Sequence, residues 1–378
     1  MRTGTVPDGP AQRRVEAVLA EVVGSGAETG VQVAAWLDGE LVVDAWAGTA
    51  DVAEGRPMGP DTLVPAWSTG KGVAAALVAV LVDRGALAYE APVAQYWPQF
   101  GAAGKERVTL GQVLAHTAGL PQLPPDVTPE RLHDLPAMAD WLAGQSPRWE
   151  PGSRPGYHAW TYGLLLAEIL RRATGRTCER LLREELAEPL GIGDELLFGV
   201  PDRLLPRVAT CYDGGWAARL ERMPEEPFSV AVPRGVRPVA ELANRADVRR
   251  TALPANGVMT ARGAARMYAA LACGGELEDV RLLSAKTLEA ATTGWASGVD
   301  RILGVPVTMG RGFVVGDSRA TPMRSAVAFG TSGSGGSAAC ADPANRFSFA
   351  LVKNRMTVHG LDVRLIGEVR AALGLADG

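Results

Sequence analysis

The sequence contains few of the residues that proteins use to bind metals or to build disulfide frameworks. It has four histidines and four cysteines among 378 residues, and no two cysteines form a Cys-x-x-Cys pair. No spacing typical of zinc ligands is present either. We therefore expect no metal site and four buried free thiols in a reducing cytosol, at Cys178, Cys211, Cys273 and Cys340.

The sequence also lacks an excess of positive charge and a long apolar run. The formal net charge is −4, whereas nucleic acids and anionic membranes attract basic patches. The longest apolar run, residues 73–82, is too short to cross a bilayer. The N-terminus shows no apolar core of a signal peptide. We expect a cytoplasmic protein that binds neither nucleic acid nor a membrane, and the oligomeric state stays open.

The composition, 47% hydrophobic and 21% charged residues, is that of a globular protein with a large core. Two β-rich runs flank Asp38-Gly39, which is a strong hairpin signal. Apolar periodicity predicts helices over residues 11–23, 72–84, 161–173, 177–188, 261–272 and 360–373. The runs RGFVVG and FSFALVKN predict antiparallel strands late in the chain, whereas residues 200–256 show no clear pattern.

Because strands near both ends enclose the helices, these elements predict an α+β fold. We expect one catalytic domain, residues 1–378, with an antiparallel β-sheet flanked by helices. A mostly helical subdomain is inserted at roughly residues 85–255. Alternating βαβ units are not evident, which argues against a doubly wound sheet.

Ser68 and Lys71 lie three residues apart in PAWSTGKGVAAAL, at the start of an apolar helix. This spacing places both side chains on one helical face. A serine hydroxyl is a useful nucleophile only when a base removes its proton. Lysine is such a base when burial and the positive end of a helix lower its pKa. Ser68 is thus the candidate nucleophile and Lys71 its base, although Ser-x-x-Lys also occurs by chance.

Two further segments carry candidate residues. Tyr157 follows a Pro/Gly turn in PGSRPGYHAWTYG, and a phenol beside a lysine acts as an anionic or proton-relaying base. The alternative is a structural tyrosine. In FGTSGSGGSAACADP, glycines allow backbone N–H groups to approach a substrate closely and to supply one donor of an oxyanion hole. The Ser68 amide is the expected second donor. A phosphate cradle is the alternative, but neither glycine-rich phosphate motif fits.

These three segments occur in the order found in serine β-lactamases and penicillin-binding proteins. Over most of its length the chain resembles class C β-lactamases and the related family VIII carboxylesterases. Further matching segments are LGQVLAHTAGL, EPGSRPGYHAWTYGLLLAEILRRATG, EPLGI, NGVMTARGAARMYAAL, RLLSAKTLE and FALVKNRM. The resemblance implies the fold expected above, with Ser68 as nucleophile, Lys71 as base and Tyr157 as the tyrosine of the second motif.

The resemblance also implies a last motif at Thr331, Ser332 and Gly333, with the Ser334 amide in the oxyanion hole. His116 corresponds to a family histidine that we interpret as structural. Two residues depart from the β-lactamase pattern. Ala159 stands where Tyr-x-Asn has an asparagine that orients an amide substrate, and Thr331 stands where lysine, or histidine in the esterases, binds a carboxylate. Both departures argue against β-lactam substrates.

We therefore expect a serine acyl-transfer enzyme that forms an acyl-enzyme on Ser68 with small-molecule esters or amides and needs no cofactor. It acts as a carboxylesterase, or as a transacylase of antibiotic biosynthesis with an amine or alcohol acceptor. Trp67, Trp149 and Trp160 are candidates for a substrate pocket. The alternatives are a β-lactamase or DD-peptidase-type hydrolase, an α/β-hydrolase that uses the segment AWSTG, and a ligand-binding protein without catalysis.

Overall fold

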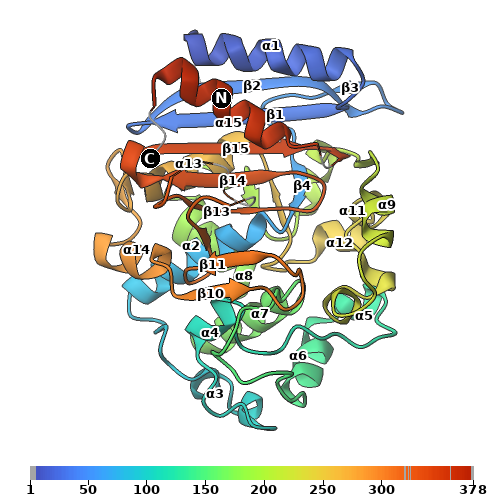
Figure 1. Ribbon diagram of the computed structural model, residues 1–378, viewed down its shortest axis with the longest axis vertical. Coiled ribbons are helices and arrows are strands. Elements are labelled where there is room, and N and C mark those ends of the chain that lie inside the picture. Colours follow the sequence, from blue (N-terminus) through green and yellow to red (C-terminus); the bar gives the residue numbers. More distant parts are fainter. Residues whose placement is uncertain (1–5, 319–320, 322, 324, 358, 376–378) are drawn as a thin grey trace.

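A nine-stranded antiparallel sheet forms the centre of the protein (Figure 1). The structure is a computed structural model that describes residues 6–318, 321, 323, 325–357 and 359–375. The strand order is β10-β11-β12-β13-β14-β15-β1-β2-β3, and each pair of neighbours is antiparallel. The strands are β1 Gly30–Leu37, β2 Glu40–Asp51, β3 Arg56–Pro57, β10 Ala296–Val299, β11 Pro306–Met309, β12 Val314–Val315, β13 Phe329–Ser332, β14 Ala338–Asp342 and β15 Phe347–Lys353.

Helices cover both faces of this sheet, as the alternation of side chains along β1 requires. Val31, Val33 and Ala35 pack on one face against α1 (Pro10–Gly24) and α15 (Leu361–Leu373). Ala34 and Trp36 point to the other face and join the large core there. That core includes α13 (Ala261–Ala272), α2 (Gly70–Asp83) and α14 (Ala285–Thr292).

Between α2 and α13 most of the regular elements are helices. These helices are α3 Val93–Tyr96, α4 Leu110–Leu114, α5 Pro129–Leu132, α6 Leu135–Ala143, α7 Thr161–Thr174, α8 Cys178–Leu182, α9 Trp216–Glu221, α10 Phe228–Ala231, α11 Ala240–Ala243 and α12 Ala246–Arg250. In Figure 1 some of them lie below β10 and β11 and others, including α9, α11 and α12, lie to the right of the sheet. A π-helical turn, Arg183–Ala187, extends α8. Single 3₁₀ turns are at Pro98–Gly101, Asp202–Arg207, Arg234–Val236 and Pro343–Asn345.

Three small sheets lie outside the central sheet. β4 (Val64–Trp67) and β5 (Leu196–Leu197) both pair with β7 (Gly257–Met259). The other two sheets are β6 (Tyr212–Asp213) with β16 (Arg355–Met356), and β8 (Glu276–Leu277) with β9 (Val280–Arg281). No helix in the described part of the chain is long and apolar enough to cross a membrane.

Helix α2 is buried along almost its whole length, from Gly70 to Leu81. Its first residue lies directly against β7, because a Cβ atom on Gly70 would be 2.4 Å from the amide nitrogen of Gly257. Only glycine permits this approach of two backbones. The contact fixes the N-terminal end of α2 beside β4, the strand that leads into it.

The predicted α+β fold is confirmed, including the early helix and the hairpin at Asp38-Gly39. The α/β-hydrolase alternative is wrong, because the central sheet is antiparallel. The expectation of four buried thiols holds for three of them, whereas Cys273 is partly exposed; all four are unpaired. The division of the domain at about residues 85 and 255 stays a prediction.

Candidate active site

Ser68 lies at the junction of β4 and α2, where the chain turns sharply. Trp67, the last residue of β4, has a φ of 50°, in the left-handed region that bulky residues rarely occupy. This turn presents the Ser68 side chain at the start of α2, and Lys71 follows one helical turn later. Nζ of Lys71 lies 2.9 Å from Oγ of Ser68, so the pair that the spacing predicts is within hydrogen-bond distance.

Lys71 is surrounded by aromatic rings and is only 3% exposed. Its Nζ lies 4.9 Å from the ring centre of Tyr157 and 5.8 Å from that of Tyr162. Because burial disfavours the charged ammonium, the pKa of Lys71 falls to about 7. The free amine of Lys71 is therefore accessible near neutral pH.

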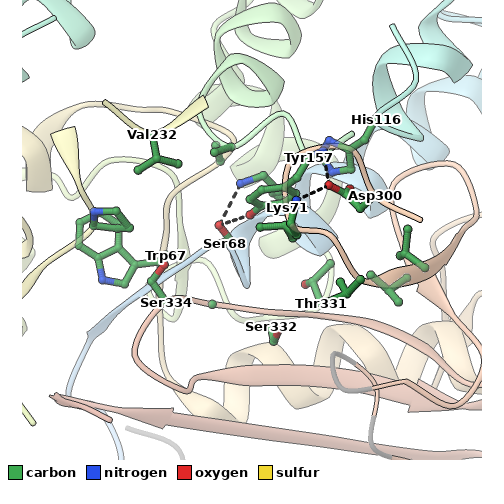
Figure 2. Close-up of a pocket in the computed structure, with 18 of the residues that line it drawn as sticks. Trp67, Ser68, Lys71, His116, Tyr157, Val232, Asp300, Thr331, Ser332 and Ser334 are labelled. Atoms are coloured by element: carbon green, nitrogen blue, oxygen red, sulfur yellow. Dashed lines mark hydrogen bonds between the residues drawn. The ribbon is translucent and has the colours of Figure 1, made fainter. Parts of the chain in front are cut away.

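Tyr157 comes from the turn before α7 and meets Ser68 from the side of Lys71 (Figure 2). Its hydroxyl donates to Oγ of Ser68 over 2.7 Å. Although its ring borders the pocket, close protein contacts desolvate the hydroxyl and raise its pKa to about 12. Tyr157 is thus a neutral phenol at physiological pH. This state fits the expected proton relay better than the expected phenolate.

Two histidines support the turn that carries Tyr157. Nδ1 of His116 accepts from the amide of His158 over 3.1 Å, and Nε2 of His158 accepts from the amide of Leu120 over 2.9 Å. Burial lowers the pKa of both imidazoles, to about 4 for His158. His116 therefore has the structural contacts that we expected, and its neutral ring also borders the pocket 5.1 Å from the Tyr157 ring.

The last motif follows β13 and packs against the turn that holds Ser68. Thr331 points inward: its hydroxyl donates to the carbonyl oxygen of Thr69 over 3.0 Å and contacts the Tyr268 hydroxyl. The position that is cationic in related enzymes thus binds the protein itself. Ser332, Gly333 and Ser334 border the pocket, and so does part of Thr331. In the view of Figure 2, Ser334 lies on the opposite side of Ser68 from Tyr157.

Gly333 is the point of closest contact between this motif and the Ser68 turn. A Cβ atom at this position would lie 2.0 Å from the carbonyl oxygen of Ala66. We expect Gly333→Ala to displace the Ser334 amide and to lower kcat on the order of 100-fold, the effect of losing one oxyanion donor. Steady-state kinetics would be compared with Gly367→Ala, a position in α15 with open space around it. Equal kcat values for both variants would refute the expectation.

A pocket of about 700 Å³ opens above Ser68, within the size range of small-molecule sites. One wall comes from the region around α9 and α10, which the sequence left unassigned. The other wall comes from the β10–β11 hairpin.

Of the three candidate tryptophans, Trp67 and Trp160 line the pocket. Trp149 does not; it packs under Arg301 and against Gly156 instead. The other apolar lining residues include Trp216, Leu220, Met223, Phe228, Val232, Leu303, Val305, Val307 and Met309.

Asp300 is a pocket residue that the sequence reasoning missed. Its carboxylate oxygen Oδ1 accepts from the amide of Tyr157 over 3.1 Å. A single aspartate in VDRILGV, 143 residues beyond Tyr157, carries no sequence signal for this contact.

The site combines a serine hydroxyl, a buried amine, a neutral phenol and a backbone loop around one pocket. Such a set can activate a serine toward a carbonyl carbon. Within the described ranges no cluster of histidine, cysteine and acidic side chains has the arrangement of a metal site.

Comparison with known proteins gives consistent matches. The beta-lactamase family model matches residues 15–373. The esterase/beta-lactamase LipL of Mycobacterium tuberculosis is 37% identical over 347 residues, which cover 86% of this chain and 77% of that protein. The crystal structure of a family VIII carboxylesterase superposes with a TM-score of 0.88 at 34% identity, covering 98% of this chain and all of the other. A penicillin-binding protein homolog from Caulobacter crescentus gives a TM-score of 0.86 at 38% identity, with 98% and 99% covered.

Proposed function

Because this chain belongs to the beta-lactamase family, we propose that it is a serine carboxylesterase that works through an acyl-enzyme on Ser68. One observation carries the proposal: Nζ of Lys71 and the hydroxyl of Tyr157 both lie within hydrogen-bond distance of Oγ of Ser68. The three groups meet in an apolar pocket large enough for a small-molecule ester. The names of two relatives, an esterase/beta-lactamase and a family VIII carboxylesterase, support this substrate class.

Acylation begins with the neutral amine of Lys71. Oγ of Ser68 attacks the ester carbonyl carbon while its proton passes to Nζ of Lys71. The negative charge that develops on the carbonyl oxygen is held by the amides of Ser68 and Ser334, and each such donor contributes about 3 kcal/mol. When the C–O bond breaks, the leaving alkoxide takes a proton from Tyr157, which is recharged by the Lys71 ammonium. An alcohol leaves, and the acyl group remains on Ser68.

Deacylation uses the same groups in the reverse order. A water molecule attacks the acyl carbonyl and gives its proton to Lys71. Oγ of Ser68 then leaves and regains a proton through Tyr157 or Lys71, and a carboxylic acid is released. An amine or alcohol in place of water gives a new amide or ester by the same steps. The transacylase of antibiotic biosynthesis that the sequence predicts is this second case, and it stays a prediction.

The pocket favours esters over β-lactams for an electrostatic reason. β-Lactam antibiotics carry a carboxylate, and Thr331 offers it no positive charge because its side chain is a neutral hydroxyl, which donates to the carbonyl oxygen of Thr69. Ala159 cannot supply the amide side chain that would bind a substrate amide. The β-lactamase and DD-peptidase alternatives are therefore weaker candidates than the esterase.

Intact-mass spectrometry with a panel of p-nitrophenyl esters and benzylpenicillin tests the proposal. We expect an acyl adduct with an ester to form at least about 100-fold faster than the penicillin adduct, because no cation binds the penicillin carboxylate. Adding an amine as an acceptor distinguishes hydrolysis from transfer, since a transacylase would lose the adduct faster and form an amide.

The other outcomes decide between the alternatives. A faster adduct with penicillin would favour a β-lactamase or DD-peptidase. If no donor labels the protein and none of the p-nitrophenyl esters is hydrolysed, the esterase proposal fails and a ligand-binding protein on this fold becomes the better interpretation.

A further inference from the structure

The loop at the tip of the β10–β11 hairpin is held together by hydrogen bonds to one residue, Asp300. The amide of Asp300 donates to the carbonyl oxygen of Val305 over 2.9 Å, and the amide of Gly304 donates to the carbonyl oxygen of Asp300 over 2.8 Å. Oδ1 of Asp300 also accepts from the amides of Ile302 and Leu303, both over 2.8 Å. Aspartate is suited to such turns because its side chain reaches backbone amides a few residues ahead.

The same oxygen reaches beyond its own loop. Oδ1 of Asp300 accepts a hydrogen bond from the amide of Tyr157 over 3.1 Å. The amide of the next residue, Arg301, donates to the carbonyl oxygen of Pro155 over 3.0 Å. Asp300 is 5% exposed, so water does not replace these bonds easily. The hairpin tip is therefore fastened to the segment that carries the tyrosine (Figure 2).

The remaining amides near Tyr157 are bound from another direction. The amide of Gly156 donates to the carbonyl oxygen of His116 over 2.9 Å, and that of His158 to the imidazole of His116 over 3.1 Å. Hydrogen bonds from two sides thus hold this segment. His116 accepts from the amides of Gly156 and His158, and Asp300 accepts from the amide of Tyr157 between them.

The hairpin is also the wall of the substrate pocket. Leu303, Val305, Val307 and Met309 line it, and all four belong to the tip or to β11. β10 is an edge strand, and within the sheet it pairs with β11 alone. A shift of this wall is therefore transmitted to Tyr157 through Asp300 and Arg301.

We infer that Asp300 is a positioning residue, which holds the Tyr157 backbone so that the tyrosine hydroxyl meets Oγ of Ser68, and which couples that position to the apolar pocket wall. The role rests on the proposed acyl transfer through Ser68. It depends on the acceptor geometry of one oxygen, because three amides converge on Oδ1.

Three substitutions separate geometry from charge in steady-state kinetics with a p-nitrophenyl ester. Asp300→Ala removes the acceptor, and we expect kcat to fall roughly 100-fold with little change in KM, as for a misplaced catalytic group. Asp300→Asn should stay within about threefold of wild type, because its amide oxygen accepts the same N–H groups. Asp300→Glu keeps the charge on a longer side chain and should lower kcat as Asp300→Ala does. The glutamate variant also replaces Asp300→Ala in the test if the alanine variant does not fold.

The matched control is Asp279→Ala, an exposed aspartate in the turn of the β8–β9 hairpin. It should leave kcat unchanged. An Asp300→Ala variant that is folded and as active as wild type overturns the positioning role, as does an Asp300→Asn variant as impaired as Asp300→Ala. Acyl labelling of wild-type Ser68 is measured in parallel, so that a failure of the proposed function is recognised separately.

Discussion

Replacing Ser68 with alanine is expected to abolish the acyl adduct and to lower kcat/KM for p-nitrophenyl esters on the order of 10⁴-fold or more. In the proposed mechanism this hydroxyl is the group that forms a covalent bond to the substrate, so no neighbouring side chain replaces it. The loss should appear in kcat, because the pocket walls that bind the ester are unchanged. Intact-mass spectrometry and steady-state kinetics measure the two effects.

Ser153→Ala is the control for this substitution. Ser153 lies exposed in the turn before Tyr157, and its hydroxyl donates to the carbonyl oxygen of Glu150. This variant should keep both the adduct and the rate. An adduct that persists in Ser68→Ala would place the nucleophile elsewhere and would contradict the mechanism.

Replacing Lys71 with methionine is expected to lower kcat/KM roughly 10³-fold, within the range that general bases contribute. The wild-type rate should rise with pH through about 7, because Lys71 accepts the Ser68 proton only as the free amine and its pKa is about 7. Below that pH the ammonium accumulates and kcat/KM should fall about tenfold per pH unit. A pH profile of kcat/KM from pH 5 to 9 measures this acid limb.

Lys71→Arg distinguishes a base from a simple positive charge. The guanidinium stays protonated at every pH of the profile, so it can hold a charge near Ser68 but cannot accept the proton. We expect it to be as impaired as Lys71→Met. Activity close to wild type in Lys71→Arg would show that Lys71 acts through its charge, and the proposed acylation step would then be wrong.

The local part of the site was accessible from the sequence. Ser68 and Lys71 are three residues apart, and the turn that leads from β4 into α2 brings their side chains within hydrogen-bond distance, although α2 itself begins only at Gly70. Tyr157 lies 89 residues from Ser68; its segment made it a candidate, but the resemblance to a known family was needed to choose this role over a structural tyrosine. Much of the fold was predictable from local patterns as well. Asp38-Gly39 between two β-rich runs indicates the early hairpin, and the spacing of apolar residues indicates the helices.

The rest of the pocket depends on contacts that have no local pattern. The wall around α9 and α10 comes from a stretch rich in proline and arginine, without helical or strand periodicity. Asp300 acts through the backbone of a residue 143 positions away, which no spacing rule reveals. Trp149 was expected near the substrate because it is adjacent in sequence to the motif, but its indole packs beneath Arg301.

The burial of Lys71 also affects the thermodynamic stability of the fold. In the unfolded chain this lysine titrates near 10.5, whereas in the native state its pKa is about 7. Between these two values the unfolded state binds one more proton, so the free energy of unfolding rises with pH across this window. Below about pH 7 the lysine is a desolvated ammonium, which costs about 5 kcal/mol of stability. The burial of Lys71 thus lowers the stability of the folded state, and the Lys71→Met variant should be more stable than the wild type.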